Sequence, residues 1–268
     1  LYTKPLEISK TKALSDQGHN YDNHMTLSTS DRDCLDWWLH NLDSMYKPII
    51  TPDPQYTIFS DSSLQGWGFH DPQTGVKNGG QWPVSEQHYH INVLELKGAF
   101  ISIQSCCKNM KDIHVRLMSD SSTTVHCINN QGSTKSMECH QVAREIWLWC
   151  IDRNIWISAA HIAGILNSSA DEASRVFNED IEWGLDEGQF DQIMQRFGPC
   201  DIDLFASQYN HKLPVYCSWK PDPHCTFVDA FSFPWKQFHN PYIFAPFSIV
   251  GKVMQKIITE NLNRAVIV

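Results

Sequence analysis

The feature that most constrains the fold of this chain is a stretch from Ile91 to about Cys107. Its apolar side chains recur around nearly the whole circumference of a helix. A helix of this kind is buried on nearly all sides. Glu95 lies within the stretch, where a carboxylate is costly unless a cation or hydrogen-bond donors compensate its charge. The stretch therefore predicts a central helix that carries one acid needing a partner.

The segments around this helix predict the element order β-β-β-α-β-α-α-β-α. A strand from Tyr56 to Ser60, a second beginning near Gly66, and turns at 71–75 and 78–80 indicate consecutive antiparallel hairpins. After the helix, alternation and helical spacing indicate a strand at 113–117, helices at about 122–130 and 138–152, and a strand at 155–159. We therefore expect an α/β protein with a mixed five-stranded sheet flanked by helices.

Changes in composition and the positions of prolines divide the chain into three parts. Ser30 and Asp33 have the spacing of a helix cap in the first part, and a linker follows at Pro48, Pro52 and Pro54. The character changes again after Arg175, where an amphipathic helix, a strand and an aromatic, proline-rich stretch follow. The expected parts are a helical segment at 1–54, an α/β domain at 55–178, and an α/β extension at 179–268.

Composition narrows the class of protein. The 268 residues contain no apolar run long enough to cross a membrane and no signal-peptide pattern at the start, so we expect no membrane partner. Nine cysteines, an odd number without a C-x-x-C pair, fit a reducing intracellular compartment, cytoplasmic or nuclear. The net charge of −9 works against binding nucleic acid by charge alone. The chain lacks a start Met, so we expect it to be a piece of a longer polyprotein.

Four acids occupy positions at element ends or in the apolar helix, and each has an ordinary structural alternative. The alternatives are a turn for Asp61, a capping box with Asn92 for Glu95, a helix cap for Asp120, and a capping box with Ser168 for Asp171. If the four acids had no shared role, all four of these structural explanations would have to apply at once. Clustered carboxylates repel one another, and a shared divalent cation is the natural compensation. A set of oxygen ligands suits Mg²⁺ or Mn²⁺ better than zinc.

These acids stand in motifs that resemble those of type 1 ribonucleases H. The matching segments are Ser60-Asp61-Ser62-Ser63, Glu95-Leu96, Ser119-Asp120-Ser121 and His161-x-x-Gly164-x-x-Asn167-x-x-Ala170-Asp171. The ending Asp171-Glu172-Ala173-Ser174-Arg175 resembles that of retroelement reverse transcriptases. Further segments, among them 128–132, 147–149 and 201–207, are similar to DIRS and Ngaro tyrosine-recombinase retrotransposons. The resemblance covers 56–177 most strongly, and 1–54 looks like the segment that links polymerase to ribonuclease H.

The resemblance implies a ribonuclease H-like fold and a two-metal endonuclease that cuts the RNA strand of RNA/DNA hybrids. Two Mg²⁺ ions, replaceable by Mn²⁺, are then the cofactors. Asp61 is expected to bridge both ions, Asp171 to complete the first site, and Glu95 and Asp120 the second. His161 is expected to assist proton transfer or product release.

The same resemblance implies partners. Asn92, Asn129 and Gln131 are candidates for contacts to sugar hydroxyls or groove edges of the hybrid, because the 2′-OH distinguishes RNA from DNA. Basic residues are sparse between Asp120 and Asp171, so the basic protrusion of some cellular ribonucleases H is missing. We therefore expect the polymerase domain of the same polyprotein to supply hybrid affinity.

Two alternatives stay open. The chain can instead be a catalytically idle, retroelement-derived module that binds nucleic acid or scaffolds the polymerase, although all four acids favour the enzyme. In the last part, Phe197-Gly198-Pro199-x-Asp201-x-Asp203 with Asn240-Pro241-Tyr242 is weakly similar to phage-type adenine methyltransferases. A glycine-rich cofactor loop is missing there, which favours a structural extension.

Overall fold

A computed structural model describes residues 1–44, 52–175 and 183–268. Backbone contacts divide the chain into two compact units, Leu1–Phe100 with Asn109–Arg175, and Ile101–Lys108 with Val176–Val268. The three-part division predicted from the sequence stays a prediction. Pro48 of the predicted linker and the predicted boundary at 178–179 lie outside the described residues.

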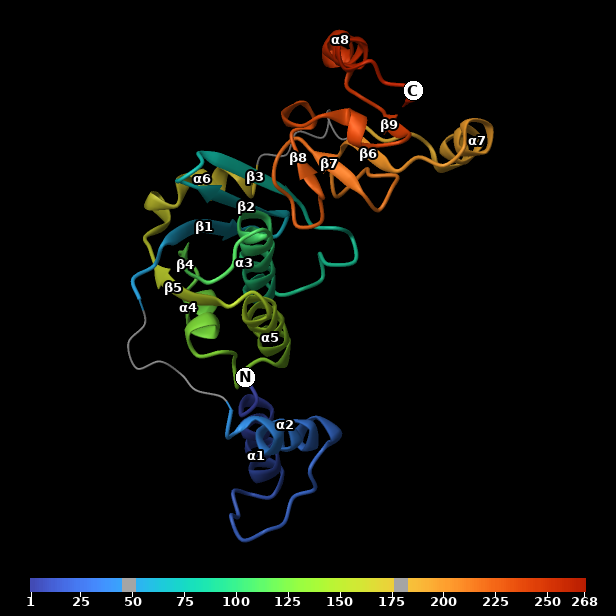
Figure 1. The fold of residues 1–268 in the computed structure, drawn as a ribbon. Coiled ribbons are helices and arrows are strands. Elements are labelled where there is room, and N and C mark those ends of the chain that lie inside the picture. The colour runs from blue at the N-terminus through green and yellow to red at the C-terminus, as the bar shows by residue number, and fades with distance from the viewer. Residues whose placement is uncertain (45–51, 176–182) are drawn as a thin grey trace. The chain divides into compact units, whose positions relative to one another are not determined.

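The first unit is built around one sheet (Figure 1). Its elements are α1 (Lys4–Asp16), α2 (Thr29–Asn41), β1 (Tyr56–Ser62), β2 (Gly66–Asp71), β3 (Val76–Gln81), α3 (Ile91–Cys107, whose last turns group with the second unit), β4 (Ile113–Ser119), α4 (Ser122–Asn129), α5 (Met137–Asp152), β5 (Ile155–His161), the 3-10 turn η1 (Gly164–Leu166) and α6 (Ser168–Ala173). The predicted element order is confirmed.

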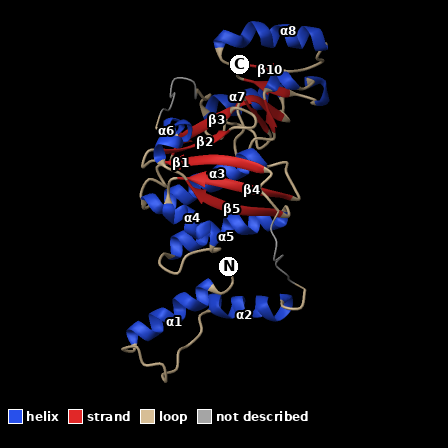
Figure 2. Cartoon of the chain, turned by 90° about the vertical axis from the view of Figure 1, so that its left-hand side faces the viewer, coloured by secondary structure: helices blue, strands red, loops and turns tan. Residues whose placement is uncertain are grey.

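The sheet of this unit has the strand order β3-β2-β1-β4-β5. β1 pairs antiparallel with β2, and β2 pairs antiparallel with β3. β4 and β5 run parallel to β1. The predicted mixed sheet, three antiparallel strands followed by two parallel ones, is therefore confirmed. Figure 2 shows its strands with α3, α4 and α5 beside them.

Neighbouring side chains of β1 point to opposite faces, as the pleat of a strand requires. The Ser62 hydroxyl donates to the carbonyl oxygen of Leu94 on α3 at 3.2 Å. Asp61 instead accepts from Ser174, which follows α6. The sheet is thus covered by α3 on one face and by α6 on the other. No residue of α3 is exposed, in agreement with its apolar circumference.

The turn predicted at 78–80 is wrong, because these residues lie inside β3. Gly79 is opposite Gly68 of β2 in the register, and both glycines face α6. A Cβ on Gly79 would collide with the carbonyl oxygen of Ala173, and one on Gly68 with backbone atoms of α6. Both positions require glycine because a helix backbone packs closely on them, and not because the chain turns there.

The helix cap predicted at Ser30 is also wrong. Ser28 is the N-cap of α2, where its hydroxyl oxygen accepts from the backbone N–H of Asp31 at 3.2 Å. The Asp31 carboxylate accepts in return from the backbone N–H of Ser28 at 2.9 Å, which completes a capping box. The helix itself is confirmed, but two serines at similar spacing competed for the cap, and the earlier one forms it.

The second unit contains a separate sheet. Its elements are α7 (Glu187–Phe197), β6 (Ile202–Ala206), β7 (Tyr216–Ser218), β8 (Phe227–Val228), β9 (Pro241–Ile243), α8 (Val250–Glu260) and β10 (Val266–Ile267), with short 3-10 turns at Ala230–Ser232, Trp235–Gln237 and Phe247–Ile249. The strand order is β10-β9-β6-β7-β8, and all four pairings are parallel. The predicted α/β character of the extension is confirmed.

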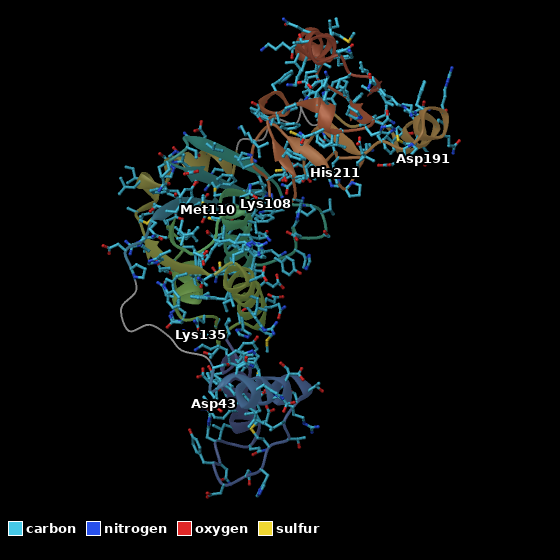
Figure 3. All side chains as sticks on the ribbon, in the orientation of Figure 1. Asp43, Lys108, Met110, Lys135, Asp191 and His211 are labelled. Atoms are coloured by element: carbon cyan, nitrogen blue, oxygen red, sulfur yellow. The ribbon has the colours of Figure 1, made fainter. Side chains whose placement is uncertain are left out.

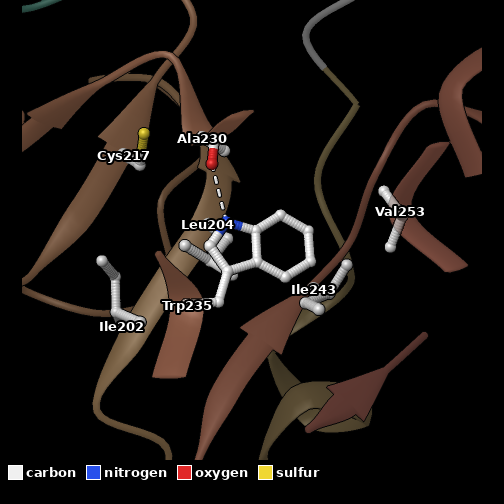
Figure 4. Packing of buried hydrophobic residues seen from close by; sticks show 7 residues of the cluster. All are labelled: Ile202, Leu204, Cys217, Ala230, Trp235, Ile243 and Val253. Atoms are coloured by element: carbon white, nitrogen blue, oxygen red, sulfur yellow. Dashed lines mark hydrogen bonds between the residues drawn. The ribbon is translucent and has the colours of Figure 1, made fainter. Parts of the chain in front are cut away.

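Trp235 is the centre of the core on one face of this second sheet (Figure 4). Its ring is fully buried, and its indole N–H donates to the carbonyl oxygen of Ala230 at 2.6 Å. Ile202, Leu204 and Ile243 pack around it from β6 and β9. Within the described ranges, every helix is too short or too polar to cross a lipid bilayer.

Candidate active site

Asp61 lies at the end of β1 that approaches the other acids. The strand runs on to Ser62, further than predicted, and Asp61 is opposite Gly68 in its register. Its side chain is 5% exposed. The Ser174 hydroxyl donates to Asp61 Oδ2 at 2.6 Å. Asp61 is therefore a buried strand residue, and the turn alternative does not describe it.

Glu95 lies in the second turn of α3. Asn92 is already inside the helix, and its backbone N–H donates to His90 Nδ1 at 3.1 Å. The capping box between Asn92 and Glu95 is therefore not formed. The Glu95 carboxylate is instead turned toward two other acids.

Asp120 follows β4 and precedes α4. The cap of α4 is Ser121, whose hydroxyl oxygen accepts from the backbone N–H of Thr124 at 3.3 Å, so Asp120 does not cap this helix. Among the described residues, Asp61, Glu95 and Asp120 form the one group of acids whose ligand atoms all lie within 4.8 Å of one another. Three acids from three different elements thus converge at one place.

Asp171 belongs to the first turn of α6, as predicted. Asn167 is the N-cap residue of this helix, so the capping box with Ser168 is not formed. The Arg175 guanidinium donates to Asp171 Oδ1 at 2.7 Å in a largely exposed ion pair. Asp171 is not in the 4.8 Å group, but its charge raises the pKa of Asp61. It is therefore an electrostatic neighbour of the other three acids.

The electrostatics of the group are unfavourable without a cation. Burial raises the pKa of Glu95 to about 8, and the charges of Asp61 and Asp120 add to the shift. Burial also raises the pKa of Asp61, while the hydrogen bond from Ser174 opposes the shift and the charges of Asp120 and Asp171 add to it. A divalent cation would relieve this repulsion, and carboxylate oxygens are the ligands that Mg²⁺ and Mn²⁺ prefer. The donor set therefore fits such an ion.

His161 ends β5 and lies beside the acids. It is opposite Ser119 in the register of β4 and β5, and its Nε2 is 3.0 Å from the carbonyl oxygen of Asp120. Because a carbonyl oxygen only accepts, Nε2 carries the proton in this contact. The imidazole is exposed, which leaves Nδ1 accessible.

The three residues predicted to contact nucleic acid have different surroundings. Asn92 is half-buried in the first turn of α3, one turn before Glu95. Both polar atoms of the Asn129 amide bind the backbone of Ala159, each at 2.8 Å. Gln131 has a positive φ of 57° in the turn after α4. Their contacts to a nucleic acid stay predictions.

Lys and Arg are scarce in the stretch of chain between two of the acids, Asp120 and Asp171, as the sequence indicated. Between Asp120 and Asp171 there are three, Lys135, Arg144 and Arg153. The Arg144 guanidinium lies over the ring of Tyr2, and that of Arg153 lies over the ring of Trp149. Both are therefore engaged in contacts within the protein. Lys135, marked in Figure 3, is exposed between α4 and α5. One exposed lysine cannot track a phosphate backbone by itself.

Two residues of the site carried no signal of their own in the sequence. Ser174 binds Asp61, and Asn167 donates from its side-chain amide to the carbonyl oxygen of Ser60 at 3.0 Å. Both are almost fully buried. Both residues lie inside the closing motif around Asp171. Their partners on β1 are more than 100 residues away, so no local pattern indicated these contacts.

The weak methyltransferase-like motif of the second unit is used internally. Asp201 accepts from the backbone N–H groups of His239 and Asn240, and the Asn240 amide donates to the carbonyl oxygen of Pro199 at 2.8 Å. The two halves of the motif thus bind each other across β6 and β9. The prediction that this unit is a structural extension stays a prediction.

No protein-family model and no curated protein sequence matches the chain. Solved structures do match. Ribonuclease H1 of the halophilic archaeon Halobacterium salinarum is 14% identical over 44% of this chain and 96% of its own, with a TM-score of 0.37. LC11 ribonuclease H1 in complex with an RNA/DNA hybrid is 16% identical over 44% and 93%, with a TM-score of 0.38. Prototype foamy virus protease–reverse transcriptase is 12% identical over 59% of this chain and 21% of its own, with a TM-score of 0.26. The fold class predicted from the sequence, a mixed sheet of three antiparallel and two parallel strands flanked by helices, is the one observed.

Proposed function

We propose that the chain is a metal-dependent endonuclease that hydrolyses the RNA strand of RNA/DNA hybrids. The convergence of Asp61, Glu95 and Asp120 within 4.8 Å is the observation that carries the proposal. These acids come from β1, α3 and the end of β4 of a ribonuclease H-like sheet, and the ordinary structural alternatives do not account for them. Together with Asp171 they are the four acids of the ribonuclease H motifs.

In this proposal two divalent ions are held by the four carboxylates. Asp61 would contribute to both sites, Asp171 to the first, and Glu95 and Asp120 to the second. When bound, the ions supply the Lewis acidity that hydrolysis of a phosphodiester requires. The carboxylates would bind the ions, and Asp61 would do so from a strand that is paired on both sides.

His161 is assigned to proton transfer at the edge of the site. Its Nε2 is engaged with the carbonyl oxygen of Asp120, so Nδ1 is the atom that can exchange a proton with water or with the leaving group. An imidazole is suited to this role because its ordinary pKa lies near neutral pH. The contact with Asp120 fixes the ring beside the acids while leaving it exposed.

Recognition of the substrate is assigned to Asn92, Asn129 and Gln131. Asn92 is the best placed, since it precedes Glu95 by one helical turn. The net charge of −9 indicates that this chain does not hold the hybrid alone. We propose that a reverse transcriptase polymerase domain of the same retrotransposon polyprotein, of the DIRS or Ngaro kind, supplies the basic surface.

The test is cleavage of a labelled RNA/DNA hybrid with Mg²⁺ or Mn²⁺, comparing the native chain with Asp61→Asn and using double-stranded DNA as the control substrate. Hybrid-specific cutting that disappears in Asp61→Asn supports the proposal. A folded native chain that binds hybrid without cutting it, at any concentration of either ion, supports the idle binding module instead.

A further inference from the structure

Ser174 is a fully buried residue that contacts the acid group directly. Its hydroxyl is 2.6 Å from Asp61 Oδ2 and 2.9 Å from the carbonyl oxygen of Asp171. A hydroxyl has one proton to donate, and a carboxylate is the stronger acceptor of the two. The proton therefore belongs mainly to the bond with Asp61.

The position of this hydroxyl is fixed from several sides. The carbonyl oxygen of Ser174 accepts from the Ser63 hydroxyl at 2.8 Å, which ties the residue to the strand that carries Asp61. The α6 backbone lies directly on Gly68 and Gly79, where no Cβ could be accommodated. Ser174 consequently has little freedom to move relative to Asp61.

This arrangement determines how Asp61 can turn. One lone pair of Oδ2 is occupied by the Ser174 hydroxyl, and the carboxylate is repelled by Glu95 and Asp120. Without the hydroxyl, rotation about the side-chain bonds would let Asp61 move away from the other two acids. With the hydroxyl in place, the remaining lone pairs of Asp61 stay directed toward the group.

We infer that Ser174 is a positioning residue that orients the Asp61 carboxylate for cation binding, and that the cation affinity of the site depends on its hydroxyl. The inference rests on the proposed metal-dependent function. Partners that hydrogen-bond to metal ligands typically contribute about 10- to 100-fold to metal affinity. Ser174 has a matched control in Ser63, whose hydroxyl holds the same residue by its carbonyl oxygen without touching a carboxylate.

The experiment is a titration of the metal-free, full-length chain with Mn²⁺, followed by calorimetry or by the electron paramagnetic resonance of free Mn²⁺. Ser174→Ala is expected to weaken Mn²⁺ binding by about 10- to 100-fold. Ser63→Ala removes one contact of Ser174 but leaves its hydroxyl on Asp61 and the packing of α6 on Gly68 and Gly79, so the loss of Mn²⁺ affinity is expected to be clearly smaller than in Ser174→Ala.

Equal losses in Ser174→Ala and Ser63→Ala would overturn the inference, because they would mean that only the docking of α6 matters. Native affinity in a folded Ser174→Ala would overturn it as well. If that variant does not fold, Ser174→Cys decides, since a thiol nearly keeps the volume but is a weak donor; native affinity in this variant overturns the inference and weaker binding supports it. A native chain that binds no Mn²⁺ would instead remove the proposed function itself.

Discussion

Two buried acids, Asp61 of the first unit and Asp222 of the second, have opposite surroundings. In the second unit Asp222 is 3% exposed, and its Oδ1 accepts from the Tyr216 hydroxyl and from the backbone N–H groups of His224 and Cys225. In the first unit Asp61 has one hydrogen-bond donor, Ser174, and faces other acids. Burial alone therefore does not mark a functional acid.

The contrast is sharpest between Asp222 and Glu95. Burial and the charges of Asp61 and Asp120 all raise the pKa of Glu95, to about 8, and no hydrogen bond is among the causes to oppose this rise. The three donors to Asp222 Oδ1 replace the water that this oxygen lost, which makes the acid part of the structure even though its Oδ2 accepts no hydrogen bond. A carboxylate buried against like charges without such donors is unfavourable in its charged form, which is relieved by taking up a proton or by binding a cation.

The largest expected effect is on cleavage. Glu95→Gln removes the charge of one proposed metal ligand and should lower the rate of hybrid cleavage by about 10³-fold, or about 4 kcal/mol. The measurement is the single-turnover rate with saturating Mg²⁺. A rate within tenfold of the native one would place Glu95 with the structural acids.

The opposite result is expected for Asp222→Ala. Three donors lose their acceptor, so the free energy of unfolding of the second unit should fall by about 3 kcal/mol. Chemical denaturation monitored by tryptophan fluorescence measures this loss, and the two units can unfold in separate transitions. Mn²⁺ affinity should be unchanged, and a weaker Mn²⁺ site in this variant would contradict the separation of roles.

Stability against pH sharpens the same comparison in the metal-free protein. The pKa of Glu95 is about 8 in the folded state against an ordinary value of 4.5, so the native state binds more protons than the unfolded chain between these values. Stability consequently falls as the pH rises through this window, and the full penalty is present above about pH 8. Relative to Glu95→Gln, the native chain should lose about 2 kcal/mol between pH 5 and pH 9, since one pKa unit corresponds to about 1.4 kcal/mol and the side chain is partly solvated. Thermal unfolding of both proteins across this range, with and without Mn²⁺, is the measurement, and parallel curves would contradict the assignment.

The smallest effect concerns Arg175. Its guanidinium is a competing cation on Asp171, and the pair is largely exposed. Arg175→Gln should therefore raise Mn²⁺ affinity by about threefold at low salt, with little change in stability. The gain should vanish at high ionic strength, where exposed charges are screened. A loss of affinity would mean that Arg175 helps to orient Asp171.

The sequence predicted the element order, because strand alternation and helical spacing are local patterns. It predicted four acids at one site, and the structure groups three of them, Asp61, Glu95 and Asp120, without Asp171. It misplaced residues 78–80, since the glycines there respond to a helix that packs on β3 from far along the chain. It also selected Ser30 for a cap that Ser28 forms, because nothing local distinguishes the two serines. The role of Ser174 was invisible for the same reason as the glycines, since its partner is a tertiary one.

The distance between Ser174 and Asp61 along the chain has a consequence for synthesis. The two residues are 113 positions apart, and the glycines that receive α6 belong to the early strands. At ordinary elongation rates the ribosome needs on the order of ten seconds to cover that separation. During this interval the nascent chain contains Asp61 but neither Ser174, which binds it, nor the helix before Ser174. The site we propose therefore cannot be complete until Ser174, directly after α6, has been made.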